Sequence, residues 1–555
     1  MELSKLDRAA CLRTELITWI ALALAMLLCS GAYAATGSSA RPNIILIVAD
    51  DLGYSDLGTF GGEISTPNID ALAASGVRLT NFHASPTCSP SRSMLLTGTD
   101  NHTAGVGAMA EILPEAARRR WGYEGRLTGR VATIAERLKA AGYSTYMVGK
   151  WHLGREPGSI PSARGFDHSF ALLQGAHNHF GQGGFGPDSS PELSATYLTD
   201  GKATTVPADF YSTDYFTDQI IQRIDQRNDT APFFAYLAYT APHSPLQAPD
   251  DIRDKYAGHY DQGWSAIYQQ RLKQMQAQGV LPDNAQIPTS GLQSQWNALP
   301  ENERKIEARK MEIYAAMVDR LDANVGRLND YLKRKGLADN TVIILLSDNG
   351  PAGETANTFR IIPGVAEYIE SHDNSLAAMG TAKSFLFYGK QWAQVASGPY
   401  AGTKGAVSEG GVRVPAIIHA PWLASPGISR SYATIMDITP TLLDIAHVDS
   451  DTRIAGNQVA PIKGLSLLPL FSNPMQTIHD DSSSYTYELH GQRSITQGGR
   501  WKLSWVPKLA GGSGEWALYD LEQDPYERSD LSKTNLAKFK QLENAWNEYA
   551  KAVKL

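Results

Sequence analysis

Short apolar runs alternate along the chain with segments of helical periodicity. The runs are rich in β-branched and aromatic residues, which is typical of parallel strands buried on both faces, and they cover residues 43–49, 144–148, 233–238 and 341–346. Residues 131–140 have helical spacing, and the clearest helix prediction covers residues 307–335, where apolar residues recur every three or four positions before Gly336. This alternation predicts an α/β domain with a mostly parallel central sheet sandwiched by helices.

The C-terminal part of the chain has a different pattern. Short alternating segments such as 493–497 and 501–505 are followed by a helical segment at 536–551, which predicts a smaller α+β domain with a short antiparallel sheet. Residues 245–305 are polar and rich in Gln, so we expect them to be a helical excursion from the main domain. The expected organisation is a main domain over residues 41–460 and a C-terminal domain over residues 461–555.

The first 34 residues have the pattern of a signal peptide. Lys5, Arg8 and Arg13 precede an apolar run over residues 16–28, which is short for a bilayer span but fits the core of a signal. Small residues follow, so we expect cleavage after Ala34. The alternative is an uncleaved membrane anchor. Cleavage predicts an exported, periplasmic protein whose mature form has no membrane segment.

Composition and cysteine content narrow the class of protein. The 555 residues are 43% hydrophobic and 19% charged, which is ordinary for a globular protein and excludes a disordered or fibrous one. The net charge of −7 leaves no basic surplus for binding nucleic acid. Because Cys11 and Cys29 lie in the predicted signal, the mature chain keeps only Cys88 and has no intramolecular disulfide. An unpaired cysteine in an exported protein is a candidate functional residue, and the residues around Cys88 are candidates for chemistry that would use it.

Polar residues directly follow the four predicted strands. Ligands of open α/β sheets bind at the carboxyl ends of the strands, so we expect these residues to converge at one edge of the sheet. Each alone has another explanation, since Asp and Asn commonly open turns and cap helices. The residues are Asp50, Asp51, Lys150, His152, His243, Asp348 and Asn349.

Cys88 lies in a segment with the signals of a helix start. Ser89 can cap a helix and Pro90 suits its first turn. Cys88 would then lie where free N–H groups and the helix dipole favour negative charge. Arg92 follows one turn later on the same face. The segment is suited to an anion or to a reactive oxygen nucleophile.

The sequence of residues 88–92 (CSPSR), followed by Leu-Thr-Gly, resembles the signature of the type I sulfatases. These are formylglycine-dependent enzymes of the alkaline-phosphatase-like superfamily. Further motifs match over nearly the whole mature chain: ADDLG at 49–53, GKWHLG at 149–154, APH at 241–243, SDNG at 347–350, TKG at 403–405, EGGVRVP at 409–415 and LYDL at 518–521. The resemblance is nearest to bacterial arylsulfatases and implies an alkaline-phosphatase-like fold.

The resemblance also implies a function and a site. In this family a formylglycine-generating enzyme converts the signature cysteine to formylglycine, whose hydrated aldehyde attacks a sulfate ester. The chain would be an arylsulfatase that cleaves aryl sulfate esters to a phenol and sulfate through a covalent sulfo-enzyme intermediate. The catalytic residues implied are Cys88, Arg92, Lys150, His152, His243 and Lys404. The metal ligands implied are Asp50, Asp51, Cys88, Asp348 and Asn349. Their oxygen donors suit Ca²⁺, with Mg²⁺ as a substitute, and argue against zinc.

The expected roles follow the chemistry of each side chain. His243 protonates the leaving oxygen, Lys150 and Lys404 hold sulfate oxygens, Arg92 steadies the diol, and His152 takes the proton whose loss releases sulfate. His152 could instead be a core histidine, and Lys404 a solvated loop lysine. Two other functions stay open: a phosphonate monoester or phosphodiester hydrolase of the same superfamily, and a non-catalytic protein that binds sulfated glycans.

Overall fold

The structure is a computed structural model that describes residues 41–555, apart from 182, 188, 189, 228, 286, 288–290 and 455. Pro42–Leu555 form one compact unit. The predicted signal peptide of residues 1–34, with its cleavage position, lies outside the described residues. Among the helices of the described part, none has both the length and the hydropathy needed to cross a bilayer.

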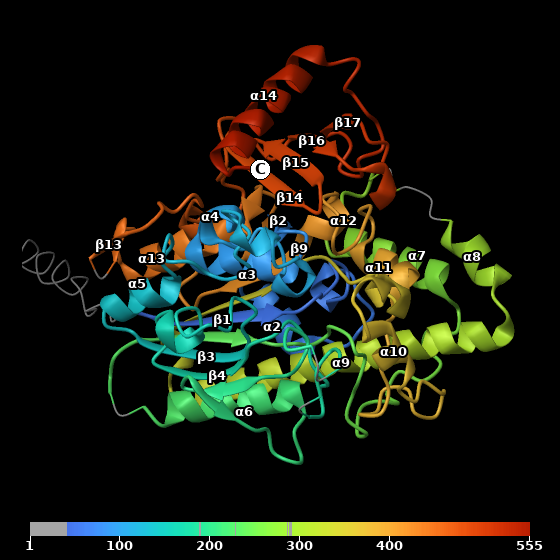
Figure 1. Cartoon of the computed structure of the whole chain (residues 1–555), viewed down its shortest axis with the longest axis horizontal. Coiled ribbons are helices and arrows are strands. Elements are labelled where there is room, and N and C mark those ends of the chain that lie inside the picture. Colours follow the sequence, from blue (N-terminus) through green and yellow to red (C-terminus); the bar gives the residue numbers. More distant parts are fainter. Residues whose placement is uncertain are drawn as a thin grey trace, which may run out of the picture. The chain divides into compact units, whose positions relative to one another are not determined.

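A mostly parallel sheet, to which the described residues contribute eleven strands, forms the centre of this unit (Figure 1). The four apolar runs predicted from the sequence are its central strands, which lie side by side and parallel in the order β8 (Thr341–Ser347), β1 (Asn43–Ala49), β7 (Phe233–Ala238) and β3 (Ser144–Lys150). Beyond β3 follow β4 (His168–Leu172), β5 (Tyr197–Thr199) and β6 (Lys202–Thr204). Beyond β8 follow β9 (Arg413–His419), β2 (Val77–His83) and β10 (Gly427–Ser429), and the short β11 (Ala433–Thr434) also pairs with β2.

Helices cover both faces of the sheet (Figure 1). Along β1, Ile45 and Ile47 point into one apolar core, whereas Ile44 and Leu46 point into the other, which explains why the strand has no polar face. The helices of the first core are α2 (Pro67–Ala74), α6 (Ser212–Asp225), α7 (Trp264–Ala277), α9 (Glu301–Arg334) and α11 (Gly389–Ser397). Those of the second are α3 (Cys88–Thr97), α5 (Ile134–Ala140) and α13 (Ile438–Ala446). The predicted sandwich of helices around a parallel sheet is confirmed.

Two predicted helices begin at other residues than expected. The helix α5 begins at Ile134 rather than at 131, because Thr133 and Glu136 form a capping box at its start. The helix α9 begins at Glu301 rather than at 307, directly after Pro300. Its first turns are polar, so the apolar spacing that predicted the helix appears only further along. The 245–305 region contains α7 and α8 (Leu292–Ala298), and its described residues form no strand.

The C-terminal part contains the expected antiparallel sheet. Its strands pair in the order β14 (Ser484–Leu489), β15 (Gln492–Gln497), β16 (Trp501–Trp505) and β17 (Trp516–Asp520). The helix α14 (Leu536–Ala552) packs Leu542 and Trp546 on this sheet. The shorter elements are α4 (Asn101–Ala104), α10 (Val365–Glu370), α12 (Glu409–Val412), β12 (Arg453–Ile454) and β13 (Asn457–Gln458).

Candidate active site

The carboxyl ends of the central strands bring the predicted residues to one edge of the sheet. Asp50 and Asp51 directly follow β1, and Lys150 is the last residue of β3. His243 lies beyond the end of β7, and Asp348 directly follows β8. All five residues are buried. The convergence expected from parallel strands is therefore present in the structure.

Cys88 is the first residue of α3, where Thr87 occupies the N-cap position with an extended backbone. The prediction that Ser89 caps this helix was wrong. The Ser91 N–H already bonds to the Thr87 carbonyl oxygen at 3.2 Å, so the first turn closes on Thr87. Pro90 then falls in the first turn, where its missing N–H costs no helical hydrogen bond. The helix therefore starts at Cys88 itself.

The Cys88 thiol faces two carboxylates. Its Sγ lies 3.5 Å from Asp50 Oδ1 and 3.9 Å from Asp51 Oδ1. Burial raises the pKa of this thiol well above its ordinary value. The unmodified side chain is therefore a protonated thiol and a poor nucleophile at neutral pH.

Two fully buried cations pair with the acids around residue 88. Lys150 Nζ donates to both oxygens of Asp50, at 2.9 and 2.8 Å. Arg92 donates through Nε to Asp348 Oδ2 at 2.9 Å and through a terminal nitrogen to the Lys150 carbonyl oxygen at 3.0 Å. Burial opposes ionisation of Asp50, but the neighbouring cations, above all Lys150, outweigh it and lower the pKa of Asp50. Burial likewise opposes the charge on Lys150, but Asp50 outweighs it and raises the pKa of Lys150, so the two side chains form a buried ion pair.

Lys404 and His243 meet on the other side of residue 88. Lys404 Nζ lies 3.0 Å from Asp51 Oδ2 and 3.1 Å from His243 Nε2. His243 Nδ1 lies 2.6 Å from the Ser244 carbonyl oxygen. Because a carbonyl oxygen only accepts, Nδ1 carries a proton and Nε2 is the nitrogen that faces the lysine. His243 is thus oriented with Nε2 toward the site.

The oxygen donors at the sheet edge fit a divalent cation. Asp50, Asp51, Cys88 and His243 each offer a ligand atom, and these atoms lie within 4.8 Å of one another. Asn349 Nδ2 donates to Asp51 Oδ1 at 2.6 Å, whereas Asn349 Oδ1 is buried without a hydrogen-bond partner. A buried amide oxygen without a partner, beside two carboxylates, is what a hard cation would satisfy.

Both carboxylate oxygens of Asp348 already accept hydrogen bonds. Its Oδ1 accepts the Asp51 N–H at 3.2 Å, and its Oδ2 accepts the Arg92 Nε–H at 2.9 Å and lies 2.8 Å from a terminal nitrogen of Arg92 in an ion pair. Each oxygen has a further lone pair available. Asp348 could therefore contribute to a metal site while it holds Arg92 in place.

His152 is held by a carboxylate that the sequence did not predict. His152 has a positive φ of 55° directly after β3, and its Nε2 lies 3.1 Å from both carboxylate oxygens of Glu111. Glu111 lies 41 positions earlier, in the short 3₁₀-helix Ala110–Ile112. No local motif marks this residue, so only the tertiary structure shows the pair.

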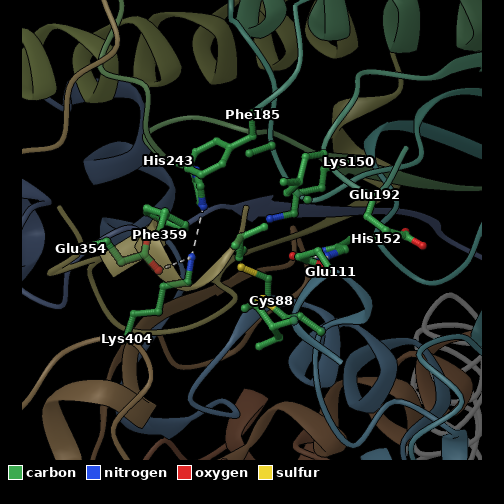
Figure 2. Close-up of a pocket in the computed structure, with 16 residues that line it drawn as sticks. Cys88, Glu111, Lys150, His152, Phe185, Glu192, His243, Glu354, Phe359 and Lys404 are labelled. Carbon is green, nitrogen blue, oxygen red and sulfur yellow. Dashed lines mark hydrogen bonds and ion pairs between the residues drawn. The ribbon is translucent and has the colours of Figure 1, made fainter. Parts of the chain in front are cut away.

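A pocket opens above these groups (Figure 2). It is lined by Cys88, Lys150, His152, His243 and Lys404 together with a largely apolar wall and three carboxylates. The apolar wall consists of Met109, Ile112, Ala176, Phe185, Leu193, Phe359 and Ile362, and the carboxylates are Glu111, Glu192 and Glu354. The pocket has charged side chains at its base and apolar walls above them. This arrangement suits an ester of a hydrophobic alcohol.

Two further histidines lie behind His243. His179 Nε2 donates to the His243 carbonyl oxygen at 3.0 Å, and its Nδ1 lies 2.8 Å from Ser212 Oγ. His177 lies 2.9 Å from Thr240 Oγ1 through Nε2. Burial lowers the pKa of His179 to about 4 and that of His177 well below its ordinary value. Both are neutral residues that support the chain segment carrying His243.

Comparison with known proteins agrees with this geometry. The sequence model of the Sulfatase family matches residues 42–448. An uncharacterized sulfatase of Schizosaccharomyces pombe is 42% identical over 93% of this chain and 95% of its own length. An arylsulfatase of Klebsiella aerogenes is 41% identical over 81% of this chain and 95% of its own length. The chain belongs to the sulfatase family and is a sulfuric ester hydrolase.

Solved structures support the same fold. The protein called Ps i-CgsB superposes with a TM-score of 0.66 and 27% identity over 92% of this chain and 93% of its own. The phosphonate monoester hydrolase of Agrobacterium radiobacter superposes with a TM-score of 0.52 at 19% identity, over 93% of this chain and 95% of its own. The second likeness concerns the fold alone.

Proposed function

We propose that the protein is an arylsulfatase, which hydrolyses aryl sulfate esters to a phenol and sulfate. The observation that carries the proposal is the position of residue 88. It lies between two carboxylates and below an apolar pocket, and Lys150, His243 and Lys404 line the same space. Kinetics on alkyl and sugar sulfates beside an aryl sulfate test this choice of substrate. A higher kcat/KM for an alkyl or sugar sulfate would identify that ester as the better substrate.

The nucleophile in this proposal is formylglycine, made from Cys88 by a formylglycine-generating enzyme. Burial holds the thiol protonated, so the cysteine itself is unsuited to attack on sulfur. The hydrated aldehyde supplies two hydroxyl groups on one carbon, the first for attack and the second for release. The mass of the peptide that contains residue 88 tests this directly, since conversion exchanges one sulfur and two hydrogens for one oxygen.

The first step forms a sulfate ester on residue 88. One hydroxyl gives its proton to a neighbouring carboxylate, Asp50 or Asp51, and its oxygen bonds to sulfur while the bond from sulfur to the phenol oxygen breaks. His243, with Nε2 toward the site, delivers a proton to the leaving oxygen. Lys150 and Lys404 hold the sulfate oxygens and balance charge in the transition state, and Arg92 steadies the diol.

The second step regenerates the aldehyde. His152 takes the proton of the remaining hydroxyl, a carbon–oxygen double bond forms, and the sulfate ester bond breaks so that sulfate leaves with the electron pair. A carboxylate beside His152 supports this role, because it stabilises the imidazolium that forms. This contact also favours the catalytic role over that of a core histidine.

We also propose that Asp50, Asp51, residue 88, Asp348 and Asn349 hold Ca²⁺, or Mg²⁺ in its place. The unpartnered oxygen of Asn349 and the oxygen-rich donor set support a hard cation. When bound, the cation lowers the pKa of the diol hydroxyl and orients it.

Chelation tests this metal assignment. Removing the cation with EDTA should abolish turnover and lower the unfolding temperature, because three carboxylates lose a counter-charge. Added Ca²⁺ should restore both. Elemental analysis that finds stoichiometric zinc would contradict the assignment.

Parallel kinetics on an aryl sulfate and an aryl phosphonate with the same leaving group separate this function from its nearest rival. We expect kcat/KM to be larger for the sulfate by at least about 10²-fold. A preference for the phosphonate would identify the protein as a phosphonate monoester hydrolase on the same fold.

We propose further that the protein is exported to the periplasm after cleavage behind Ala34. The basic start, the apolar run and the small residues before the cleavage position support this. N-terminal sequencing of protein from the periplasmic fraction should begin at Ala35. Sequencing that begins at Met1 would show an uncleaved anchor instead.

A further inference from the structure

Glu111 and His152 form a close pair at the wall of the pocket (Figure 2). Burial raises the pKa of Glu111, but His152 outweighs it, so that the pKa falls to about 2. The carboxylate is therefore charged at neutral pH and can only accept hydrogen bonds. Because both of its oxygens lie 3.1 Å from His152 Nε2, Nε2 is the ring nitrogen that carries the proton.

This contact determines which nitrogen of His152 can act as a base. With Nε2 protonated, the free lone pair lies on Nδ1. In the described part of the chain, Nδ1 is buried and has no hydrogen-bond partner. A side chain on Gly175 would lie 2.6 Å from Cε1 of the ring, so the glycine leaves room for this orientation. The ring is thus fixed with its basic nitrogen unoccupied.

The segment that carries Glu111 is itself anchored to the pocket. Arg118 donates to the Ala110 carbonyl oxygen at 2.7 Å and pairs with Glu192 at 2.9 Å. On the other side, Thr87 Oγ1 contacts Met109 Sδ at 3.1 Å, next to the start of α3. Glu111 is therefore placed by contacts that connect its segment to the pocket wall and to the residue preceding Cys88.

We propose that Glu111 is a positioning residue for His152 in the step that releases sulfate. It fixes the tautomer that leaves Nδ1 free, and its negative charge stabilises the imidazolium formed when Nδ1 takes the proton. This inference rests on the proposed function, in which that proton comes from the second hydroxyl of residue 88. Glu111 contributes nothing to the attack on sulfur, so its loss slows release and spares the first step.

The experiment compares Glu111→Ala, Glu111→Gln and the control Glu115→Gln. Glu115 is an exposed carboxylate of the same segment. Each protein, matured to formylglycine, is quenched during steady turnover of an aryl sulfate, and mass spectrometry measures the fraction sulfated on residue 88. For both Glu111 variants we expect kcat to fall by about 10- to 100-fold and the sulfated fraction to rise toward one. Glu115→Gln should match the unsubstituted protein.

A second readout does not depend on turnover. Imidazole ¹⁵N spectra of protein with unmodified Cys88 report the tautomer of His152. We expect the Nε2–H form in the unsubstituted protein and a mixture of both tautomers in Glu111→Ala. Glu111→Gln, which keeps an acceptor oxygen, should restore much of the single tautomer without restoring the rate, because it lacks the charge.

Three results would overturn the inference. One is a Glu111→Ala protein whose tautomer and sulfated fraction match those of Glu115→Gln. Another is slower turnover without a rise in the sulfated fraction, which indicates a structural role. The third is a Glu111→Gln protein with full turnover. Failure of the proposed function would look different, because the unsubstituted protein with formylglycine at residue 88 would itself not turn over aryl sulfates.

Discussion

Residue 88 places different demands on its surroundings before and after maturation. The thiol is neutral because burial raises its pKa, so it lies beside the carboxylates of Asp50 and Asp51 without adding a negative charge. A hydrated aldehyde at the same position has two hydroxyl groups to be oriented and deprotonated. Lys150 and Lys404 lie close enough to the carboxylates to balance the charge that develops. These surroundings support the proposed conversion of Cys88 to formylglycine.

Replacing Cys88 with serine separates the two chemical steps. Serine provides one hydroxyl, so sulfur transfer to it can occur, but the product is an alkyl sulfate with no second hydroxyl to drive release. We expect Cys88→Ser to lose at least about 10³-fold in steady turnover while a sulfated serine peptide accumulates. Mass spectrometry after incubation with an aryl sulfate checks this, and sustained multiple turnover by Cys88→Ser would contradict the scheme.

The elements that the sequence predicted well are those whose pattern reflects burial. The strand β1 is apolar from Ile44 to Ala49 because both of its faces are covered, and the direction of the strand alone places the residues after it at the edge of the sheet. The first turns of α9 have no apolar stripe, so periodicity could not show where the helix begins. Glu111 could not be predicted because its role depends on a contact with His152, 41 positions away.

A buried charge network connects the Lys404 loop to the C-terminal sheet. Lys502 of β16 lies 2.8 Å from Glu409 Oε1 and 2.9 Å from Glu527 Oε1, and the Glu409 N–H donates to Glu527 Oε2 at 2.7 Å. Gln492 of β15 donates to the Gly405 carbonyl oxygen at 2.6 Å. The C-terminal sheet therefore holds the chain directly after Lys404, at Gly405 and at Glu409.

Removing Lys502 should be strongly destabilising. In Lys502→Met two buried carboxylates lose their counter-charge, and we expect the free energy of unfolding to fall by about 3–5 kcal/mol. Because protonation relieves a buried carboxylate, the loss should be smaller at pH 5 than at pH 7. Urea denaturation at the two pH values checks this, with the exposed Lys508→Met as control. Equal losses in both variants would show that the network is not a stabilising feature.

Three buried histidines outside the reacting groups are held neutral. Burial lowers the pKa of His83 and His177, and lowers that of His179 to about 4. Their rings are used as oriented donors and acceptors, as His179 shows at the His243 carbonyl oxygen. The charged groups of the site are thus surrounded by neutral buried histidines. Because these histidines bind protons more readily in the unfolded chain, we expect acid to destabilise the protein.

The sign of this sensitivity follows from proton binding. An unfolded histidine takes up a proton near its ordinary pKa of 6.5, whereas His179 in the folded chain does so only near 4. Between these values the unfolded state binds more protons, so the free energy of unfolding falls as pH falls, by up to about 1.4 kcal/mol per pH unit for each such histidine. The window from pH 6.5 to 5 isolates this effect, because most carboxylates titrate below it.

Urea denaturation across that window tests the expectation. The midpoint should fall steadily from pH 6.5 to 5, and His179→Asn should make the decline shallower, whatever its stability at pH 7, because one proton fewer is taken up on unfolding. His168→Gln serves as the control, since the His168 side chain is 59% exposed and should leave the slope unchanged. A midpoint that stays constant or rises toward pH 5 would mean that the buried histidines are already charged in the folded protein, and the neutral support inferred for His243 would be wrong.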